Sequence, residues 1–270
     1  MMHINSQPGG YGVGMQIRNW RQRRRRSQLD LALDAEISAR HLSFLETGRS
    51  LPSREMVLRL AEKLDVPLRE RNELLVAAGF APLFPERSLD DPSLQAARRA
   101  VDLVLKGHEP FPALAVDRHW TLVASNAAVP PMLQGTDSSL LEPPVNVLRL
   151  SLHPDGLAPR IANIGEWRAH LFERLRHQIE LTADRKLIEL LEELKGYPVL
   201  EEEPGGQPAV DYGSVVIPFR LRSGGRELAF FSTTTVFGTP IDITLSELAI
   251  EAFFPADEAT ASAILGSVSG

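Results

Sequence analysis

The sequence of 270 residues predicts a protein of two domains, an all-α domain of five short helices and then an α+β domain with a five-stranded antiparallel sheet. Three observations predict this fold class. Capped amphipathic helices follow one another up to residue 80, with no strand-like segment between them. A proline-rich segment, 81–92, then interrupts the helical pattern. Beyond residue 111, short runs of apolar residues alternate as in strands, and one long helical stretch lies among them.

The most informative segment, residues 27–49, predicts two short helices joined by a tight turn. Ser27 and Ser38 are N-cap residues eleven positions apart, and Gly48 marks the end of the second helix. Leu42 and Leu45 face inward on that helix, and the inward face of the first is predicted to hold Leu29, Leu31, Ala32 and Ala35. Helices this short cannot bury an apolar face alone, so they need partners. We predict the partner helices at 15–25, 54–64 and 68–78.

This segment resembles the helix-turn-helix of the XRE family of transcription regulators, which includes the phage repressors. Ser27-Gln28-Leu29 matches the opening of the first motif helix, and Leu45-Glu46-Thr47-Gly48-Arg49 matches the Leu-Glu-x-Gly-Lys/Arg ending of the recognition helix. The resemblance implies a lambda-repressor-like DNA-binding domain over residues 14–80.

The same resemblance implies roles for individual residues. Gln28 and Ser38 are expected to hold phosphates, and four residues to face base edges: Ala39, Arg40, Ser43 and Phe44. Arg40 stands where the family has a base-reading glutamine, and it can bind guanine O6 and N7 together. His41 is expected to face solvent or a phosphate, and Arg49 completes the predicted DNA-binding set. Glu46 is expected to form an ion pair with Arg21 inside the domain, and Phe44 has the alternative of belonging to the core.

The charge of the chain is divided between its two parts. Residues 1–80 hold 13 Lys and Arg against 9 Asp and Glu, about +4, and the other 190 residues hold 16 against 26, about −10, so the formal total is −6. Six arginines lead into the helix pair, at positions 18, 21, 23, 24, 25 and 26. An arginine run of this kind is either a solvated surface or a polyanion-binding patch. Beside a helix-turn-helix, DNA contact is the favoured interpretation, with the acidic part turned away from the duplex.

Other features limit the class of protein. The chain has no cysteine, which fits a reducing cytoplasm and excludes disulfides and thiolate metal sites. No apolar stretch approaches the ~20 residues of a membrane span, so no membrane partner is expected. The first residues lack the pattern of a signal peptide, and we predict a flexible arm over 1–13. The glycines at 9–14 follow no strand, so a phosphate loop there is disfavoured.

The second part of the chain has the order of elements of a PAS-type sensor. A linker and connecting helix are predicted over 81–110, with the helix at 93–106 coupling the domains. A hairpin (113–117 and 120–125), a long helical stretch (166–195, interrupted near 182–184) and three strands (214–221, 227–237 and 241–254) follow, and then a helix capped by Asp257. The predicted result is a curved sheet with helices across one face and a pocket between them.

Residues 111–270 also resemble the ligand-binding domain of MmyB-like (MltR-type) regulators. The resemblance is carried by residues 112–120, Asn126, 146–150, 153–154, 230–233, 237–240 and 251–257. It implies a PAS-like domain that binds a small, largely apolar molecule, with fatty acids as the leading class, and no other cofactor. The predicted ligand-binding residues are Trp120, Asn126, Asn146, Arg149, His153, Phe230 and Phe237.

Several of these residues also have a purely structural interpretation. Phe and Leu side chains fill the core of any such sheet. Asn126 is placed to cap a following helix, and His153 to satisfy a loop carbonyl.

Three classes of function are consistent with these observations to different degrees. The favoured one is a bacterial one-component transcription regulator that binds an inverted repeat as a homodimer and senses an effector in its second domain. The alternative is a DNA-binding protein whose second domain serves only dimerisation or protein-protein interaction. An enzyme is disfavoured because the chain has no nucleophile elbow, no HExxH and no cysteine, and no catalytic or metal-binding residue is predicted.

Overall fold

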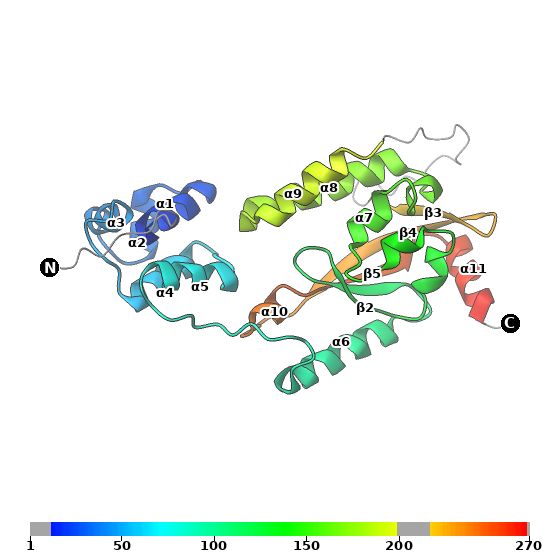
Figure 1. Ribbon diagram of the computed structural model, residues 1–270, viewed down its shortest axis with the longest axis horizontal. Coiled ribbons are helices and arrows are strands. Elements are labelled where there is room, and N and C mark those ends of the chain that lie inside the picture. Colours follow the sequence, from blue (N-terminus) through cyan, green and yellow to red (C-terminus); the bar gives the residue numbers. More distant parts are fainter. Residues whose placement is uncertain (1–11, 199–216, 269–270) are drawn as a thin grey trace. The chain divides into compact units, whose positions relative to one another are not determined.

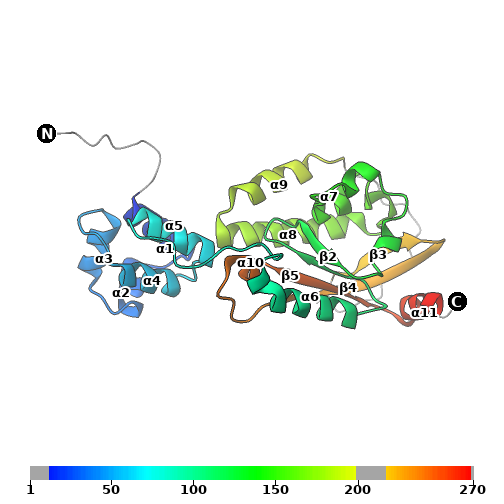
Figure 2. The ribbon, with the colours of Figure 1, turned by 60° about the horizontal axis from the view of Figure 1, so that its bottom comes forward.

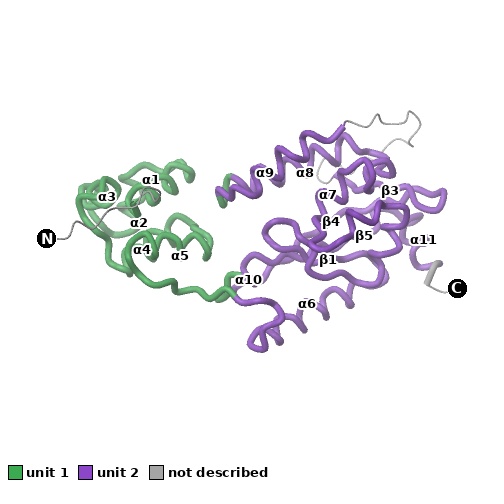
Figure 3. Tube along the Cα trace, viewed as in Figure 1, with its two compact units in different colours: residues 1–86, 180–182, 241–243 green, residues 87–179, 183–240, 244–270 purple. Residues whose placement is uncertain are grey.

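The computed structural model describes residues 12–198 and 217–268. These described residues form two compact units, one holding residues 12–86 with 180–182 and 241–243, and the other holding the rest of the described residues (Figure 3). The first unit carries five α-helices, and the second carries a five-stranded antiparallel sheet with further helices (Figure 1). The predicted fold class is therefore confirmed. Of the predicted arm, only Gly12 and Val13 are described, and Val13 already begins the first helix.

The first unit consists of α1 (Val13–Arg23), α2 (Gln28–Asp34), α3 (Ala39–Glu46), α4 (Arg54–Lys63) and α5 (Leu68–Ala77). All five helices contribute to one apolar core, whose fully buried members include Ile17, Leu31, Leu42, Leu60 and Leu75. The inward positions predicted on the helix pair are confirmed except at Leu29, whose side chain is 59% exposed. It precedes the buried Leu31 by two residues, and residues at i, i+2 do not share a helix face.

The predicted caps are present. Ser27 accepts a hydrogen bond from the Asp30 amide at 3.1 Å, and the Asp30 carboxylate accepts one from the Ser27 amide, which completes a capping box. Ser38 caps α3 by accepting from the amide of His41. In the turn between the two helices, Glu36 adopts a left-handed conformation with φ of 55°. This left-handed residue fixes the angle between α2 and α3, which neither short helix could set by itself.

A close approach at Gly14 positions α3. A β-carbon at Gly14 would lie 2.1 Å from the carbonyl oxygen of Leu45, near the end of α3, so no larger residue fits without movement of the backbone. Helix α1 therefore packs directly against the backbone of α3. Among the glycines at 9–14, Gly14 is therefore explained by the close packing of α1 against α3.

The second unit begins with η1 (Pro92–Leu94) and α6 (Gln95–Gly107), followed by the hairpin β1 (Ala113–Val116) and β2 (Leu122–Ser125). Next come η2 (Pro130–Leu133), η3 (Ser138–Leu141), α7 (Val147–Leu152), η4 (Ala158–Arg160), α8 (Ile164–Thr182) and α9 (Arg185–Lys195). The elements beyond residue 216 are β3 (Phe219–Ser223), β4 (Arg226–Val236), α10 (Ile243–Ser246), β5 (Ala249–Pro255) and α11 (Glu258–Val268).

The strand order is β2-β1-β5-β4-β3, and all neighbours are antiparallel. The last strand, β5, thus lies at the centre, where Glu251 is paired with Leu114 on one side and Thr234 on the other. Phe219, Leu221 and Phe230 pack with α7, α8 and α9 in the larger core of this unit. This face of the sheet also carries the cavity described below.

The opposite face of the sheet is covered by α6 (Figure 2). Val101 and Leu105 of α6 pack on residues of β1 and β5 that include Ala113, Ala115 and Ile250. Helices lie across one face of the sheet as expected, and α6 covers the other face as well. The helix predicted as a connector buries its apolar stripe against the sheet and so belongs to the second unit.

The expected strand at 241–254 is also wrong in its first half. Residues 243–246 form α10, and the strand begins only at Ala249. The early part of the predicted strand at 214–221 lies outside the described residues up to 216, and β3 begins at Phe219. Among the helices of the described ranges, none combines the length and the apolar character that crossing a bilayer requires.

Candidate functional site

Helix α3 carries an outward face of polar and basic residues. Leu42 and Leu45 are fully buried, so the residues between and before them point away from the core. Arg40 and His41 are exposed, and Ala39, Ser43 and Phe44 are half-buried. The structure thus brings together on one helix the residues predicted to face base edges, and it places Ser38 at the N-terminus of the same helix.

Two arginines bracket the one aromatic side chain of this face. The guanidinium carbon of Arg40 lies 5.4 Å from the centre of the Phe44 ring, and that of Arg49 lies 5.8 Å from it. Both distances fall in the range of cation–π contacts. Phe44 is not buried in the core, and it orients two exposed cations on one surface. The three residues Arg40, Phe44 and Arg49 are called the α3 cluster below.

A buried ion pair holds α3 from behind. Arg21 of α1 donates from Nε to Oε1 of Glu46 at 2.6 Å and from Nη2 to Oε2 at 2.9 Å, and the Glu46 side chain is 1% exposed. The predicted pair is therefore confirmed. The hydrogen bond that Arg21 donates to Glu46 is the main cause that raises the pKa of Arg21, against the opposing effect of burial. Gln28 adds a third donor to the same carboxylate, with its Nε2 2.8 Å from Oε2.

The arginine run divides into structural and exposed members. Arg24 donates to the carbonyl oxygens of Leu64 and Asp65, and Arg26 to that of Lys63, so both satisfy carbonyl groups at the C-terminal end of α4. With Arg21, they account for half of the cluster seen in the sequence. The other three arginines, at positions 18, 23 and 25, are exposed.

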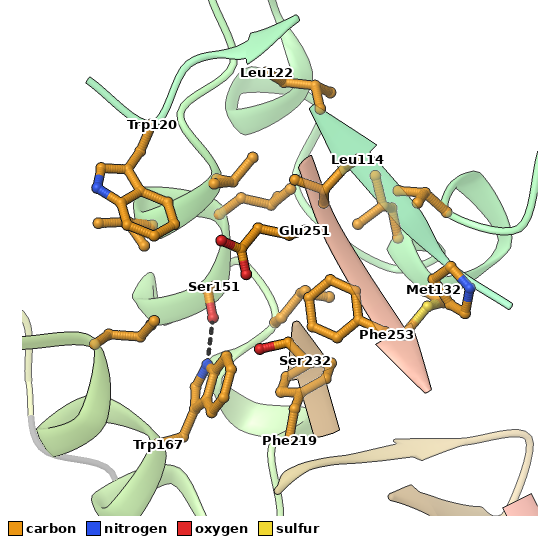
Figure 4. A pocket seen from close by; sticks show the side chains of 18 of the residues that line it. Leu114, Trp120, Leu122, Met132, Ser151, Trp167, Phe219, Ser232, Glu251 and Phe253 are labelled. Carbon is orange, nitrogen blue, oxygen red and sulfur yellow. Dashed lines mark hydrogen bonds between the residues drawn. The ribbon is translucent and has the colours of Figure 1, made fainter. Parts of the chain in front are cut away.

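The second unit contains an apolar cavity between the sheet and helices α7 and α8, with an open volume of about 100 Å³ (Figure 4). Its walls come from all five strands of the sheet and from η2, α7 and α8. The polar side chains among the lining residues are Ser151, Arg174, Ser232 and Glu251, and Trp120 and Trp167 add their indole rings. An apolar enclosure with a few polar groups is the usual form of a small-molecule site.

Arg174 and Glu251 form an ion pair at the wall of this cavity. Arg174 donates from Nη2 to Oε1 at 2.7 Å and from Nη1 to Oε2 at 3.2 Å, and the hydroxyl of Thr234 donates to Oε1 at 2.8 Å. The Glu251 side chain is 4% exposed and points into the cavity in Figure 4. The guanidinium carbon of Arg174 also lies 4.8 Å from the ring of Trp120. A fork of this kind fixes both charged groups in one geometry.

Trp120 lines the cavity from a strained backbone position. It has a φ of 65°, which is unfavourable for a bulky residue. Its indole Nε1 donates to Gln178 of α8 at 2.9 Å, and Gln178 in turn donates to the carbonyl oxygen of Arg118. The tight turn after β1 is therefore held against α8, and this contact presents the indole ring to the cavity.

A second hollow, of about 640 Å³, shares two lining residues with the cavity. Pro112 and Met132 line both, and the walls of the hollow include Leu228, Phe230 and Ile264. Methionine is flexible and adapts to irregular space. The partition between the two hollows therefore contains an adaptable side chain.

Of the seven residues predicted to bind a ligand, Trp120 lines the cavity and Phe230 lines the second hollow. Asn126 accepts from the Ala113 amide and donates to the carbonyl oxygens of Leu105 and Phe111, so it ties α6 to β1. Asn146 caps α7 by accepting from the amides of Leu148 and Arg149. Both amides are buried, and neither is among the cavity-lining residues.

The other three predicted residues also lie elsewhere. Arg149 forms a bidentate ion pair with Glu193 on the surface, at 2.7 Å for each contact. His153 packs edge-on against Tyr197, with ring centres 5.0 Å apart, and Phe237 packs in the core beneath α6. Burial, and then the hydrogen bond to Glu193, raises the pKa of Tyr197 to about 12, so its hydroxyl stays a donor.

The sequence does not predict Arg174 or Ser151 as residues of this cavity. Glu251 is part of the segment 251–257 that resembles the MmyB-like family, but no ligand-binding role is predicted for it. The signal for Glu251 is local: one carboxylate stands among apolar residues in Ala249-Ile250-Glu251-Ala252-Phe253, a central strand. An acidic residue in such a strand needs a buried partner. Arg174 has no comparable signal, because charged residues are common along α8.

An α-helical unit with a basic helix surface, joined to a unit with an apolar cavity, defines the class of DNA-binding transcription regulators with a ligand-binding domain. Residues 17–71 match the family described as "Helix-turn-helix", and residues 97–265 match the "MmyB-like transcription regulator ligand binding domain". The second match covers more than half of the chain, and the chain belongs to this family of MmyB-like regulators. No curated protein matches the sequence.

Proposed function

We propose that this chain is a bacterial one-component regulator that binds double-stranded DNA as a homodimer and responds to a small apolar effector. The observation that carries the proposal is the apolar cavity of the second unit, in a chain whose first unit exposes the α3 cluster. In the proposal, the second unit is a PAS-like sensor, and no residue has a catalytic role. The protein would act in the cytoplasm, where bacterial DNA lies.

The DNA contacts of the proposal centre on α3. Arg40 would bind a guanine through O6 and N7, and the Phe44 ring and the Ala39 methyl would contact apolar groups such as a thymine methyl. Ser43 would also face the bases. Phosphate contacts are assigned to Ser38, His41 and Arg49, together with Gln28, whose amide also donates to Glu46.

The electrostatic part of this assignment is tested by the salt dependence of binding. A duplex selected by the full chain from a random pool should bind with an affinity that falls by about one log unit per log unit of salt for each phosphate neutralised. The cations of each copy that are exposed for this role are Arg49 and the arginines at positions 18, 23 and 25, so two copies on one duplex predict a steep slope. A slope near zero would contradict the proposal.

The proposed homodimer follows from the small number of base pairs that one α3 reaches. Two copies on an inverted repeat would place their α3 helices about one helical turn of DNA apart. Sedimentation of the full chain with the selected duplex should give two protein chains per duplex. A single chain per duplex would contradict this part of the proposal.

The proposed effector has an acyl chain or a similar apolar body, as in fatty acids and their derivatives. Two observations support it: the walls of the cavity are largely apolar, and its polar groups include Arg174 and Glu251 beside Trp120. The open space is smaller than the 300–1,000 Å³ of typical ligand sites, so a long chain would need Met132 to move toward the second hollow. Native mass spectrometry and solvent extraction of purified protein should find a bound small molecule.

A cavity-filling variant separates this function from the alternative, a second unit that serves only dimerisation or protein-protein interaction. Leu171→Trp should abolish the binding of an added long-chain alcohol and leave the oligomeric state unchanged. Leu103→Trp is the matched control, because Leu103 is 71% exposed on α6. If wild type and both variants bind no apolar molecule, the alternative is favoured.

A further inference from the structure

The charged side chains that line the cavity are one cation and one anion, and they neutralise each other. Both oxygens of Glu251 accept from Arg174, and Oε1 accepts from Thr234 as well. The remaining polar lining groups, Ser151 and Ser232, are uncharged. The hydroxyl of Ser151 accepts a hydrogen bond from the indole of Trp167 at 2.9 Å (Figure 4). The cavity therefore has no net charge of its own.

One histidine lies behind this wall, and it does not change the balance. His170 packs against Trp167, with ring centres 5.5 Å apart. Burial lowers the pKa of His170, and so does the positive charge of Arg174, while the charge of Glu251 opposes them. Both effects favour the uncharged imidazole, and the charged side chains that line the cavity are those of Arg174 and Glu251.

An ionised carboxylate entering this space would meet two unfavourable choices. If it took over Arg174, the carboxylate of Glu251 would remain buried without its partner. If it left the pair intact, it would lie near another carboxylate where water does not screen the repulsion. A neutral head group avoids both, because it can accept from the second N–H of Arg174 Nη1 or from Ser151 while the pair stays closed.

We propose that Glu251 makes the cavity selective for ligands with a neutral head group, such as an acyl-chain alcohol, ester, amide or protonated acid, and against ionised carboxylates. Glu251 is thus a specificity-determining residue, acting through its closed pair with Arg174. This inference rests on the proposed function, since it presumes that an acyl-chain molecule enters the cavity.

The first test compares decanol with decanoate on the full-length protein between pH 5 and pH 8, followed by the fluorescence of the cavity tryptophans. The affinity for decanol should stay constant within about twofold. The affinity for decanoate should fall by about tenfold per pH unit above the pKa of the free acid, because only the protonated form binds. Wild-type protein that binds decanoate at pH 8 as tightly as decanol overturns the inference and leaves the proposed effector site standing.

The second test uses Glu251→Gln, which preserves size and a hydrogen-bond acceptor but leaves the charge of Arg174 unpaired. Decanoate at pH 8 should bind this variant at least tenfold more tightly than wild type, and its pH dependence should disappear. Glu193→Gln is the matched control, because it removes a carboxylate from an arginine pair on the surface and should behave as wild type. If Glu251→Gln and Glu193→Gln give the same affinity for decanoate, the role of Glu251 is rejected.

The two proposals fail in different ways. If neither decanol nor decanoate binds wild type at any pH, both the neutral-head-group inference and the proposed effector site are overturned. If Glu251→Gln does not fold, the pH series on wild-type protein is sufficient to accept or reject the inference.

Discussion

The guanidinium carbon of Arg40 lies 5.4 Å from the ring centre of Phe44, one turn further along α3. Arg49 approaches the same ring from beyond the helix end, at 5.8 Å. An arginine held over an aromatic ring loses less side-chain freedom when it binds a base edge than one that moves freely in solvent. Phe44 therefore restricts both cations of the α3 cluster, which favours the DNA contacts that we propose for them.

Arg40→Ala should weaken binding to the selected duplex by about 1–3 kcal/mol and relax specificity at one base position, because a bidentate contact to guanine is lost. Competition among duplexes that differ at single positions measures both effects. Arg185→Ala, at a highly exposed arginine of the second unit, should leave affinity and specificity unchanged. Equal weakening of Arg40→Ala on every duplex would mean that Arg40 contacts only the phosphate backbone.

Glu46→Ala should destabilise the first unit by about 3–5 kcal/mol, because it leaves Arg21 buried without its partner and removes an acceptor of Gln28. Urea unfolding followed by circular dichroism measures the loss. Asp34→Ala is the control within the same unit. It removes a pair with Arg26 in which the Asp34 side chain is 50% exposed, and should change stability by less than about 1 kcal/mol. Equal effects of the two substitutions would refute a structural role for the Arg21–Glu46 pair.

Gly14→Ala should destabilise the same unit by about 1–3 kcal/mol through overpacking, although alanine is the better helix former. The added methyl group would lie against the carbonyl oxygen of Leu45 and push α1 away from α3. Gly107→Ala, where a β-carbon meets no atom within 4 Å, is the matched control and should be neutral or stabilising. A stable Gly14→Ala protein would show that α1 and α3 do not pack as closely as described.

Asp184 should contribute stability that is lost in acid. It accepts from His119 at 2.8 Å, pairs with Arg118 and caps α9. Burial raises the pKa of Asp184, but the hydrogen bond from His119 and the charge of Arg118 outweigh it, so the pKa lies below its ordinary value near 4. A carboxyl group whose pKa is lower in the folded state stabilises the fold above its unfolded pKa, and this contribution disappears as the pH falls below about 4.

Asp184→Asn retains the cap and removes the charge, so it isolates this effect. The difference in unfolding free energy between wild type and the variant should be constant from pH 7 to pH 5 and shrink below pH 4. Urea unfolding across this range provides the measurement. A difference that does not vary with pH would show that the charge of Asp184 contributes nothing.

The first unit could be predicted from the sequence almost completely, because its signals are local. Ser27 and Ser38 cap helices within three residues of themselves, and each cap is present in the structure. The Arg21–Glu46 pair spans 25 residues, and the resemblance to the helix-turn-helix family supplied that partner. The prediction that Leu29 faces inward is wrong, because a seven-residue helix has too few turns to define its apolar face.

The cavity was less predictable, because its polar pair joins positions 77 residues apart on a helix and a central strand. The sequence pattern favours polar residues near strand and loop ends as ligand anchors, but Asn126 and Asn146 satisfy backbone groups there. Such amides are indistinguishable from ligand anchors until the topology is known. The strand predicted at 241–254 is wrong in its first half for a related reason. Ile243 is buried in α10, and a short apolar run does not distinguish a buried helix from a strand.

If a ligand in the cavity of the second unit controls DNA binding by α3, as we propose, the affinity for DNA must change when the cavity is filled. The affinity of the full chain for its selected duplex is measured by fluorescence anisotropy, with and without saturating decanol, on wild type and on Leu171→Trp. We expect the affinity to change at least about fivefold for wild type and not at all for the variant. Equal affinities of wild type with and without decanol, in the presence of proven decanol binding, would contradict it.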